Sequence, residues 1–107
     1  MMEFLKQFDA GELDMNNVRP GKRLLTGING AKCGMMFCND TEFGELGDHD
    51  DQEGFLVLEG DGEVYIDGKS YPVSPDTAIL LQAHQLHTFR RNASSCALKI
   101  FWFHSAI

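Results

Sequence analysis

The stretch that decides the fold is residues 54–73, which read GFLVLEGDGEVYIDGKSYPV. Its first part, GFLVLEG (54–60), is a short apolar run, which predicts a buried strand ending at the turn signal Asp61-Gly62. The segments EVYI (63–66) and KSYPV (69–73) flank Asp67-Gly68, a pair typical of a two-residue hairpin turn. These three short strands with tight turns between them predict an antiparallel sheet.

Short apolar runs separated by turn signals continue in both directions from this stretch. Upstream, KRLLTGI (22–28) and AKCGMMFC (31–38) flank Asn29-Gly30, the strongest two-residue hairpin signal. Downstream, TAILLQ (77–82) and LHTF (86–89) predict strands, and CALKIFWFH (96–104) predicts a long final strand. Turn signals recur about every ten residues, a spacing that favours an all-β sandwich or barrel over an α/β fold.

The length of 107 residues predicts one domain, residues 1–107, with a barrel over residues 22–107. Residues 1–21 are ambiguous, because Phe4, Leu5 and Phe8 have helical spacing but the run stops at Ala10-Gly11. We expect an N-terminal arm or a short helix there.

Composition excludes several classes of protein. The formal net charge of −7 argues against a nucleic-acid partner, and no apolar run is long enough to span a membrane. The N-terminus has no apolar core like that of a signal peptide. The three cysteines form no CxxC pair, which favours a reducing, cytoplasmic location with each cysteine as a small buried hydrophobe.

A candidate site precedes the first of these strands, in GDHDDQEG (47–54). Side chains alternate in an extended chain, so His49, Asp51 and Glu53 share a face with Phe55 and Val57. That face should look into the core, where a carboxylate is costly unless a cation neutralises it. Imidazole with carboxylate is a sound ligand pair for several metals. The acidic run alone favours a solvated loop at a barrel mouth over a metal site.

A second candidate region is PDTAILLQAHQLHTFRRN (75–92), in which His87, Phe89 and Arg91 share a face. His87 could look into the same interior as His49 and Glu53, although the spacing alone does not establish this. A guanidinium on that face could clamp a carboxylate or phosphate through paired hydrogen bonds. The alternative for Arg91 is a surface position beside one of the many acids.

The final strand has two apolar faces. Trp102 and His104 lie on one face with Leu98 and Ile100, whereas Phe101 and Phe103 lie on the other. One face should fill the barrel, with Trp102 and His104 as core or pocket lining. The other would be exposed in an isolated barrel, which indicates a homodimer.

Together the two candidate regions resemble the cupin superfamily of small β-barrels, with motifs G-x5-H-x-H-x3,4-E-x6-G and G-x5-P-x-G-x2-H-x3-N. His49 falls on the second histidine of the first motif, Glu53 on its glutamate and Gly60 on its closing glycine. His87 falls on the histidine of the second motif. The resemblance covers about residues 31–104 and implies an RmlC-like jelly-roll barrel, the double-stranded β-helix.

In metal-binding cupins these motifs supply the ligands, so the resemblance implies that His49, Glu53 and His87 bind Fe, Mn, Zn or Ni. Gly47 stands at the position of the first histidine, which removes one ligand. Asp51, His84 and Cys38 are candidate replacements with stronger explanations elsewhere, as solvated or core residues. We expect water or a substrate oxygen to complete the metal site.

The resemblance also implies a small organic ligand in the barrel, and a clamp at Arg91 would make that ligand an anionic one. Its binding residues would be Phe55, Phe89, Arg91 and Trp102, with no catalytic residue assigned. Isomerase, lyase and dioxygenase chemistry all suit the family. A non-catalytic binding or sensing module and a metal-free sugar-modifying enzyme with a histidine base remain alternatives.

Overall fold

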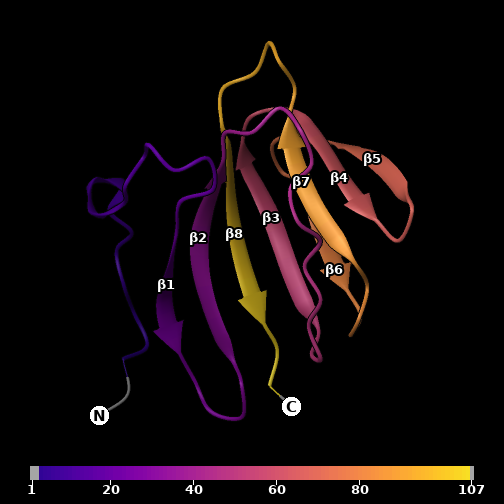
Figure 1. The fold of residues 1–107 in the computed structure, drawn as a ribbon. Helices are drawn as coiled ribbons and strands as arrows, with labels where there is room; N and C mark the ends of the chain where they lie inside the picture. Colours follow the sequence, from indigo (N-terminus) through magenta and orange to yellow (C-terminus); the bar gives the residue numbers. More distant parts are fainter. Residues whose placement is uncertain (1–2, 107) are drawn as a thin grey trace.

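The computed structural model describes residues 3–106, which form eight strands and one turn of 3₁₀ helix (Figure 1). In chain order the elements are η1 (Ala10–Glu12), β1 (Gly21–Thr26), β2 (Lys32–Cys38), β3 (Glu53–Glu59), β4 (Gly62–Ile66), β5 (Lys69–Val73), β6 (Ala78–Leu81), β7 (His87–Arg91) and β8 (Leu98–His104). The prediction of an all-β fold is confirmed.

The strands form two antiparallel sheets. One has five strands in the order β1-β2-β8-β3-β6, and the other has three in the order β5-β4-β7. Figure 1 shows β7, β4 and β5 on one side of the molecule and β1, β2, β8 and β3 on the other. Chain neighbours such as β6 and β7 lie in different sheets, so the strands cross between sheets as in a jelly roll.

The hairpin turns form where the dipeptides predict them. Asn29 and Gly30 have φ of 54° and 88°, and Asp67 and Gly68 have φ of 45° and 95°. Two successive positive φ angles are the requirement of the type I′ turn, which Asn-Gly and Asp-Gly meet at low cost. These turns fix the β1–β2 and β4–β5 registers.

The core lies between the two sheets. Its fully buried members include Val57 on β3, Val64 on β4, and Leu98 and Ile100 on β8. Burying an aliphatic side chain of this size stabilises a fold by about 1.5–3 kcal/mol. The buried residues of β8 are those at even numbers, which confirms the expected alternation and puts His104 on the inner face.

The N-terminal segment is an extended arm that contains one short helix. Its 3₁₀ turn at Ala10–Glu12 follows Asp9, whose side chain accepts a hydrogen bond from the Gly11 amide. The Phe8 ring contacts Phe37 with 6.2 Å between centroids, and Lys22 pairs with Glu12. No helix in residues 3–106 is long and apolar enough to cross a membrane.

Strand register positions the polar residues at one end of the sandwich. Glu53 opens β3 and lies directly opposite His104 on β8, because the β3–β8 register pairs these two positions. The loop before β3 adds an isolated bridge, in which the Gly47 amide donates to the His87 carbonyl at 2.7 Å. Three distant segments therefore meet at Glu53.

Candidate metal centre and adjoining pocket

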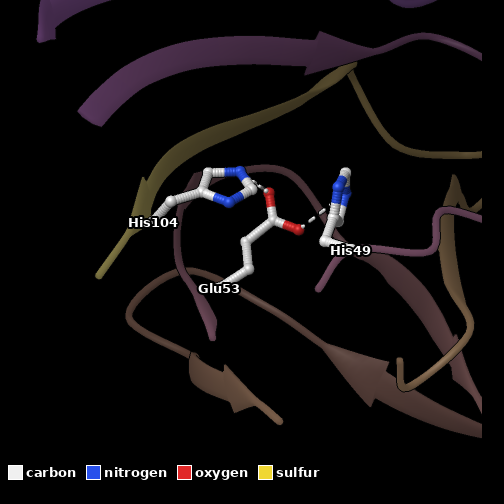
Figure 2. Close-up of side chains that lie close together, drawn as sticks. All are labelled: His49, Glu53 and His104. Atoms are coloured by element: carbon white, nitrogen blue, oxygen red, sulfur yellow. Dashed lines mark ion pairs between the residues drawn. The ribbon is translucent and has the colours of Figure 1, made fainter. Parts of the chain in front are cut away.

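Glu53 is the centre of a cluster of three histidines. It opens β3 on the inner face and is only 7% exposed. Its Oε1 lies 3.2 Å from Nε2 of His49 and 3.1 Å from Nε2 of His87, and its Oε2 lies 3.0 Å from Nε2 of His104. Figure 2 shows His49 and His104 on opposite sides of the Glu53 carboxylate. The chain thus gathers three imidazoles around one buried carboxylate.

The Nδ1 nitrogen of His87, on the side of the ring away from Glu53, already has a hydrogen-bond partner. Its Nδ1 lies 2.9 Å from the backbone carbonyl of Gln85, which can only accept, so Nδ1 carries the proton. In a neutral ring, Nε2 then presents a lone pair to Glu53. Burial alone would lower the pKa of His87, but the Glu53 carboxylate and the Gln85 carbonyl raise it above its ordinary value of 6.5.

His104 repeats this arrangement on the large sheet. Its Nδ1 lies 2.9 Å and 3.0 Å from the two carboxylate oxygens of Asp51, so that nitrogen also carries the proton. Burial works to raise the pKa of Asp51, but the hydrogen bond and charge of His104 outweigh it, and the pKa is lowered from 3.8. Asp51 is therefore an ionised acceptor that fixes the orientation of His104.

The geometry fits a cation between these groups. Glu53 Oε1 is buried and has no hydrogen bond within residues 3–106, although two imidazole nitrogens lie within 3.2 Å of it. If neutral, His87 and His104 would each direct the lone pair of Nε2 at a lone pair of a Glu53 oxygen, and the two lone pairs would repel each other. Ligand atoms about 2.1 Å from one metal lie about 3.0–3.4 Å apart, which matches these spacings. The outer hydrogen bonds of His87 and His104 are those that metal-bound histidines ordinarily make.

Within residues 3–106, the side-chain atoms of His49, Glu53 and His104 all lie within 4.8 Å of one another, as a shared ion requires. His87 does not belong to that mutually close set, but it contacts the same carboxylate. The structure thus brings together the three predicted metal ligands, His49, Glu53 and His87, and adds His104.

Gly47 packs directly against this cluster. A Cβ built on Gly47 would lie 2.9 Å from Nε2 of His87 and 3.5 Å from Nε2 of His49. The backbone of Gly47 does not have positive φ, so the backbone itself does not require glycine there. A side chain at this position would point into the cluster, which is where the cupin motif has its first histidine.

A cavity of about 220 Å³ adjoins the cluster on the side of His49 and His87. Its walls include Met36, Phe55 and Phe89, which are apolar, and its rim includes Arg19 and Glu45. The Phe55 and Phe89 rings contact edge to face, with 5.1 Å between centroids, and Phe55 also contacts the His87 ring. The pocket thus has a polar floor and apolar walls, the usual character of a small-molecule site.

The predicted ligand-binding residues divide into two groups. Phe55 and Phe89 line this pocket, whereas Arg91 and Trp102 do not. Arg91 lies at the far end of β7, where its guanidinium donates to the carbonyls of Asn39, Asn92, Ala93 and Ser95. Trp102 packs beneath His104, with 5.6 Å between ring centroids in an edge-to-face arrangement.

The three candidate replacements for the missing histidine also have other partners. Asp51 orients His104, and His84 is an exposed loop residue 2.9 Å from Asp48. Cys38 is fully buried in the core, with its thiol 3.5 Å from the Phe89 carbonyl. The residue that joins the cluster instead is His104.

Neither the contact of His104 with Glu53 nor the place of Arg19 at the pocket was predicted from the sequence. His104 is a partner of Glu53, and its place on the inner face was readable from the alternation of β8. Arg19 reaches the pocket rim from the arm before β1, and no sequence pattern indicated it. Both depend on contacts between segments far apart in the chain.

The comparisons with known proteins decide the family. A model of the cupin domain matches residues 40–104. The chain belongs to the cupin family. A search of curated protein sequences found no match.

Solved structures agree on the fold. A cupin superfamily protein from Desulfitobacterium hafniense superposes with a TM-score of 0.76 at 14% identity, covering 100% of this chain and 99% of that chain. An RmlC-like cupin from Shewanella frigidimarina gives 0.74 at 15% identity, covering 96% and 93%. Salicylate 1,2-dioxygenase from Pseudoaminobacter salicylatoxidans, in a G106A mutant, gives 0.71 at 14% identity, covering 81% of this chain and 26% of that one. The predicted jelly-roll barrel is thereby confirmed.

Proposed function

We propose that this cupin binds a divalent transition metal with His49, Glu53, His87 and His104, and a small organic ligand in the adjoining pocket. The observation that carries the proposal is the buried Glu53 carboxylate, which faces three imidazole nitrogens at 3.0–3.2 Å while one of its oxygens has no hydrogen bond among the described residues 3–106. In this set His104 supplies the imidazole that Gly47 does not. Three imidazoles with one carboxylate suit Fe(II), Mn(II), Zn(II) or Ni(II).

When bound, a metal here would supply Lewis-acid or oxygen-activating chemistry. Gln85 and Asp51 hold His87 and His104 with Nε2 toward Glu53, so the ligands need little reorganisation. Phe55 and Phe89 exclude water from one side of the pocket and leave room for a ligand beside His49 and His87. Isomerase, lyase or dioxygenase activity are the enzymatic forms of this proposal.

The test is the metal content of the purified protein and the binding of added Zn(II) and Mn(II) to chelator-treated protein. We expect one metal per chain. Glu53→Gln should weaken binding by more than about a hundredfold, because even the outer partners of metal ligands are worth about 10–100-fold. His84→Ala is the matched control, because this exposed histidine contacts Asp48 and should leave affinity unchanged. A chain that takes up neither metal rules out the metal site.

A second candidate is a non-catalytic, metal-free binding module. The raised pKa of His87 favours it, because a protonated His87 can itself compensate the Glu53 carboxylate. Gly47 favours it too, since it removes one of the usual ligands. The same metal measurement distinguishes the two candidates.

We also propose a cytoplasmic homodimer. The outer face of the large sheet has an apolar hollow of about 450 Å³ whose lining includes Leu56, Leu80, Phe101 and Phe103, with Leu80 58% exposed. Leu80→Lys should shift the dimer to monomer in light-scattering measurements. Ile28→Lys is the control, because Ile28 is 67% exposed on the β1–β2 turn. A wild-type protein that is monomeric would contradict the dimer.

A further inference from the structure

Arg19 is the one cation on the rim of the pocket among the residues that line it. It comes from the arm before β1 and extends to β7, where its Nη2 donates to the Phe89 carbonyl at 2.8 Å. The same Nη2 donates to the Glu42 carbonyl at 3.1 Å and lies 3.6 Å from Asp40 Oδ2. Three separate groups thus hold the guanidinium in place through a single nitrogen.

The remaining donors of Arg19 have no partner. Within residues 3–106, neither Nε nor Nη1 of Arg19 makes a hydrogen bond, although a guanidinium carries five N–H groups in a planar fork. Asp40 at 3.6 Å compensates part of the charge but is beyond hydrogen-bond length. Gly44 allows the close approach of the guanidinium, because a Cβ there would lie 2.9 Å from Nε.

The position of Arg19 relative to the cluster is fixed by β7. The Phe89 carbonyl that it holds is two residues from His87, which is about 7 Å along a strand. The Arg19 side chain is 26% exposed, so the guanidinium is partly buried and solvent weakens its charge less than that of a fully exposed arginine. The apolar rings of Phe55 and Phe89 line the same cavity as Arg19, His49 and His87.

We propose that Arg19 binds the carboxylate of a small organic acid whose other end lies against Phe55 and Phe89, beside His49 and His87. This deepens the proposed function, since it names the ligand class of the same pocket, and it moves the anion-binding role from Arg91 to Arg19. Paired N–H donors match a carboxylate in geometry. A cavity of about 220 Å³ limits the acid to a small one.

Glu45 allows an independent test of how charge at the pocket entrance affects the binding of a carboxylate. It also lies on the rim, it is exposed, and it makes no ion pair with Arg19. Its carboxylate repels a second anion near the same entrance. Removing that charge should strengthen carboxylate binding without disturbing the hydrogen bonds that hold Arg19.

The experiment is an NMR titration of ¹⁵N-labelled full-length protein, with and without Zn(II). Benzoate and lactate are the probes, and benzamide and lactamide are their uncharged counterparts. We expect the carboxylates to bind at least about tenfold more tightly than the amides, the lower end of the range for a charged hydrogen bond. Shifts should centre on Phe55, Thr88 and Phe89.

Variants test the assignment to Arg19. Arg19→Gln should remove the preference for carboxylate over amide, whereas Arg23→Gln, an exposed arginine on β1, should retain it. Glu45→Gln should raise carboxylate affinity about twofold to fivefold and leave amide affinity unchanged. If Arg19→Gln does not fold, Arg19→Lys, which keeps the charge but not the planar fork, should weaken carboxylate binding to metal-free protein, and unchanged affinity would overturn the inference.

The outcomes separate this inference from the metal proposal. Carboxylate binding that requires Zn(II) but not Arg19 would mean direct binding to the metal, and would overturn the inference while supporting the metal site. Carboxylate preference that depends on Arg19 in protein that binds no metal would support the inference alone. Wild-type protein that binds neither benzoate nor lactate, or binds acids and amides equally, would overturn the inference.

Discussion

Strand β7 has a charged or polar side chain at each end, and the two ends differ in how those side chains are satisfied. At its C-terminal end, Arg91 donates to four backbone carbonyls and to the Asn39 side chain. At its N-terminal end, His87 faces Oε1 of Glu53, a buried carboxylate oxygen that has no hydrogen bond in residues 3–106. Buried polar groups are nearly always paired, so the unpaired Glu53 oxygen supports the proposal that this end of β7 binds the metal.

This contrast separates Arg91, which the structure ties to backbone carbonyls, from the residues that we propose bind a metal or ligand. Arg91 was a reasonable candidate for ligand binding because it shares a face with His87 in sequence. The structure gives it loop carbonyls instead, whereas Arg19 lines the pocket and, within residues 3–106, its Nε and Nη1 make no hydrogen bond. Residue type alone could not distinguish the two arginines.

The largest expected effect is on stability at the Arg91 end. Arg91→Gln should lower the free energy of unfolding by about 2–3 kcal/mol, because several carbonyls lose a charged donor. Metal affinity should not change. Urea unfolding and Zn(II) titration measure the two quantities, and Arg23→Gln on exposed β1 is the charge-matched control. A loss of metal affinity with stability unchanged would reverse the assignment of the two ends.

Next in size is the effect of the residue behind His104. Asp51→Asn should weaken Zn(II) binding by about 10–100-fold, since Asp51 fixes the protonated nitrogen and the orientation of His104. The comparison variant is Asp50→Asn, an exposed neighbour in the same loop. Equal affinities for the two variants would show that His104 is not a ligand.

A smaller effect is expected at Gly47. The Cβ of Gly47→Ala would lie 2.9 Å from Nε2 of His87, so the imidazole must move. We expect metal affinity to fall by roughly threefold to tenfold, less than for Asp51→Asn, because the ring can rotate. Calorimetric Zn(II) titration measures this, with the urea midpoint as a check on folding. Unchanged affinity would remove His87 from the ligand set.

The smallest expected effect is a pH dependence of the metal-free protein. The folded-state pKa of His87 is raised above 6.5, so its stabilising contribution is complete below 6.5 and is lost as pH rises through the folded pKa. The loss of stability in His87→Gln should therefore be larger at about pH 5.5 than at about pH 8.5. Urea unfolding in chelator measures it. A loss that grows with pH would contradict the sign.

Much of the fold could be predicted from local sequence. The Asn29-Gly30 and Asp67-Gly68 dipeptides set two hairpins because they tolerate positive φ, and the apolar runs between turns set the strands. The alternation before β3 placed His49 and Glu53 on one face, and in the structure His49 lies 3.2 Å from the buried Glu53 carboxylate. These predictions hold because turn chemistry and side-chain alternation are local properties of the chain.

What only the tertiary structure decided is which distant residues meet. The β3–β8 register puts Glu53 opposite His104, and the Gly47–His87 bridge brings the preceding loop to β7. Register between strands that are far apart in the chain depends on packing of the whole sandwich, which no local pattern encodes. The sequence by itself determined that a histidine and a glutamate would face the interior. The tertiary structure decided that three histidines surround that glutamate, and that Arg19 rather than Arg91 stands at the pocket.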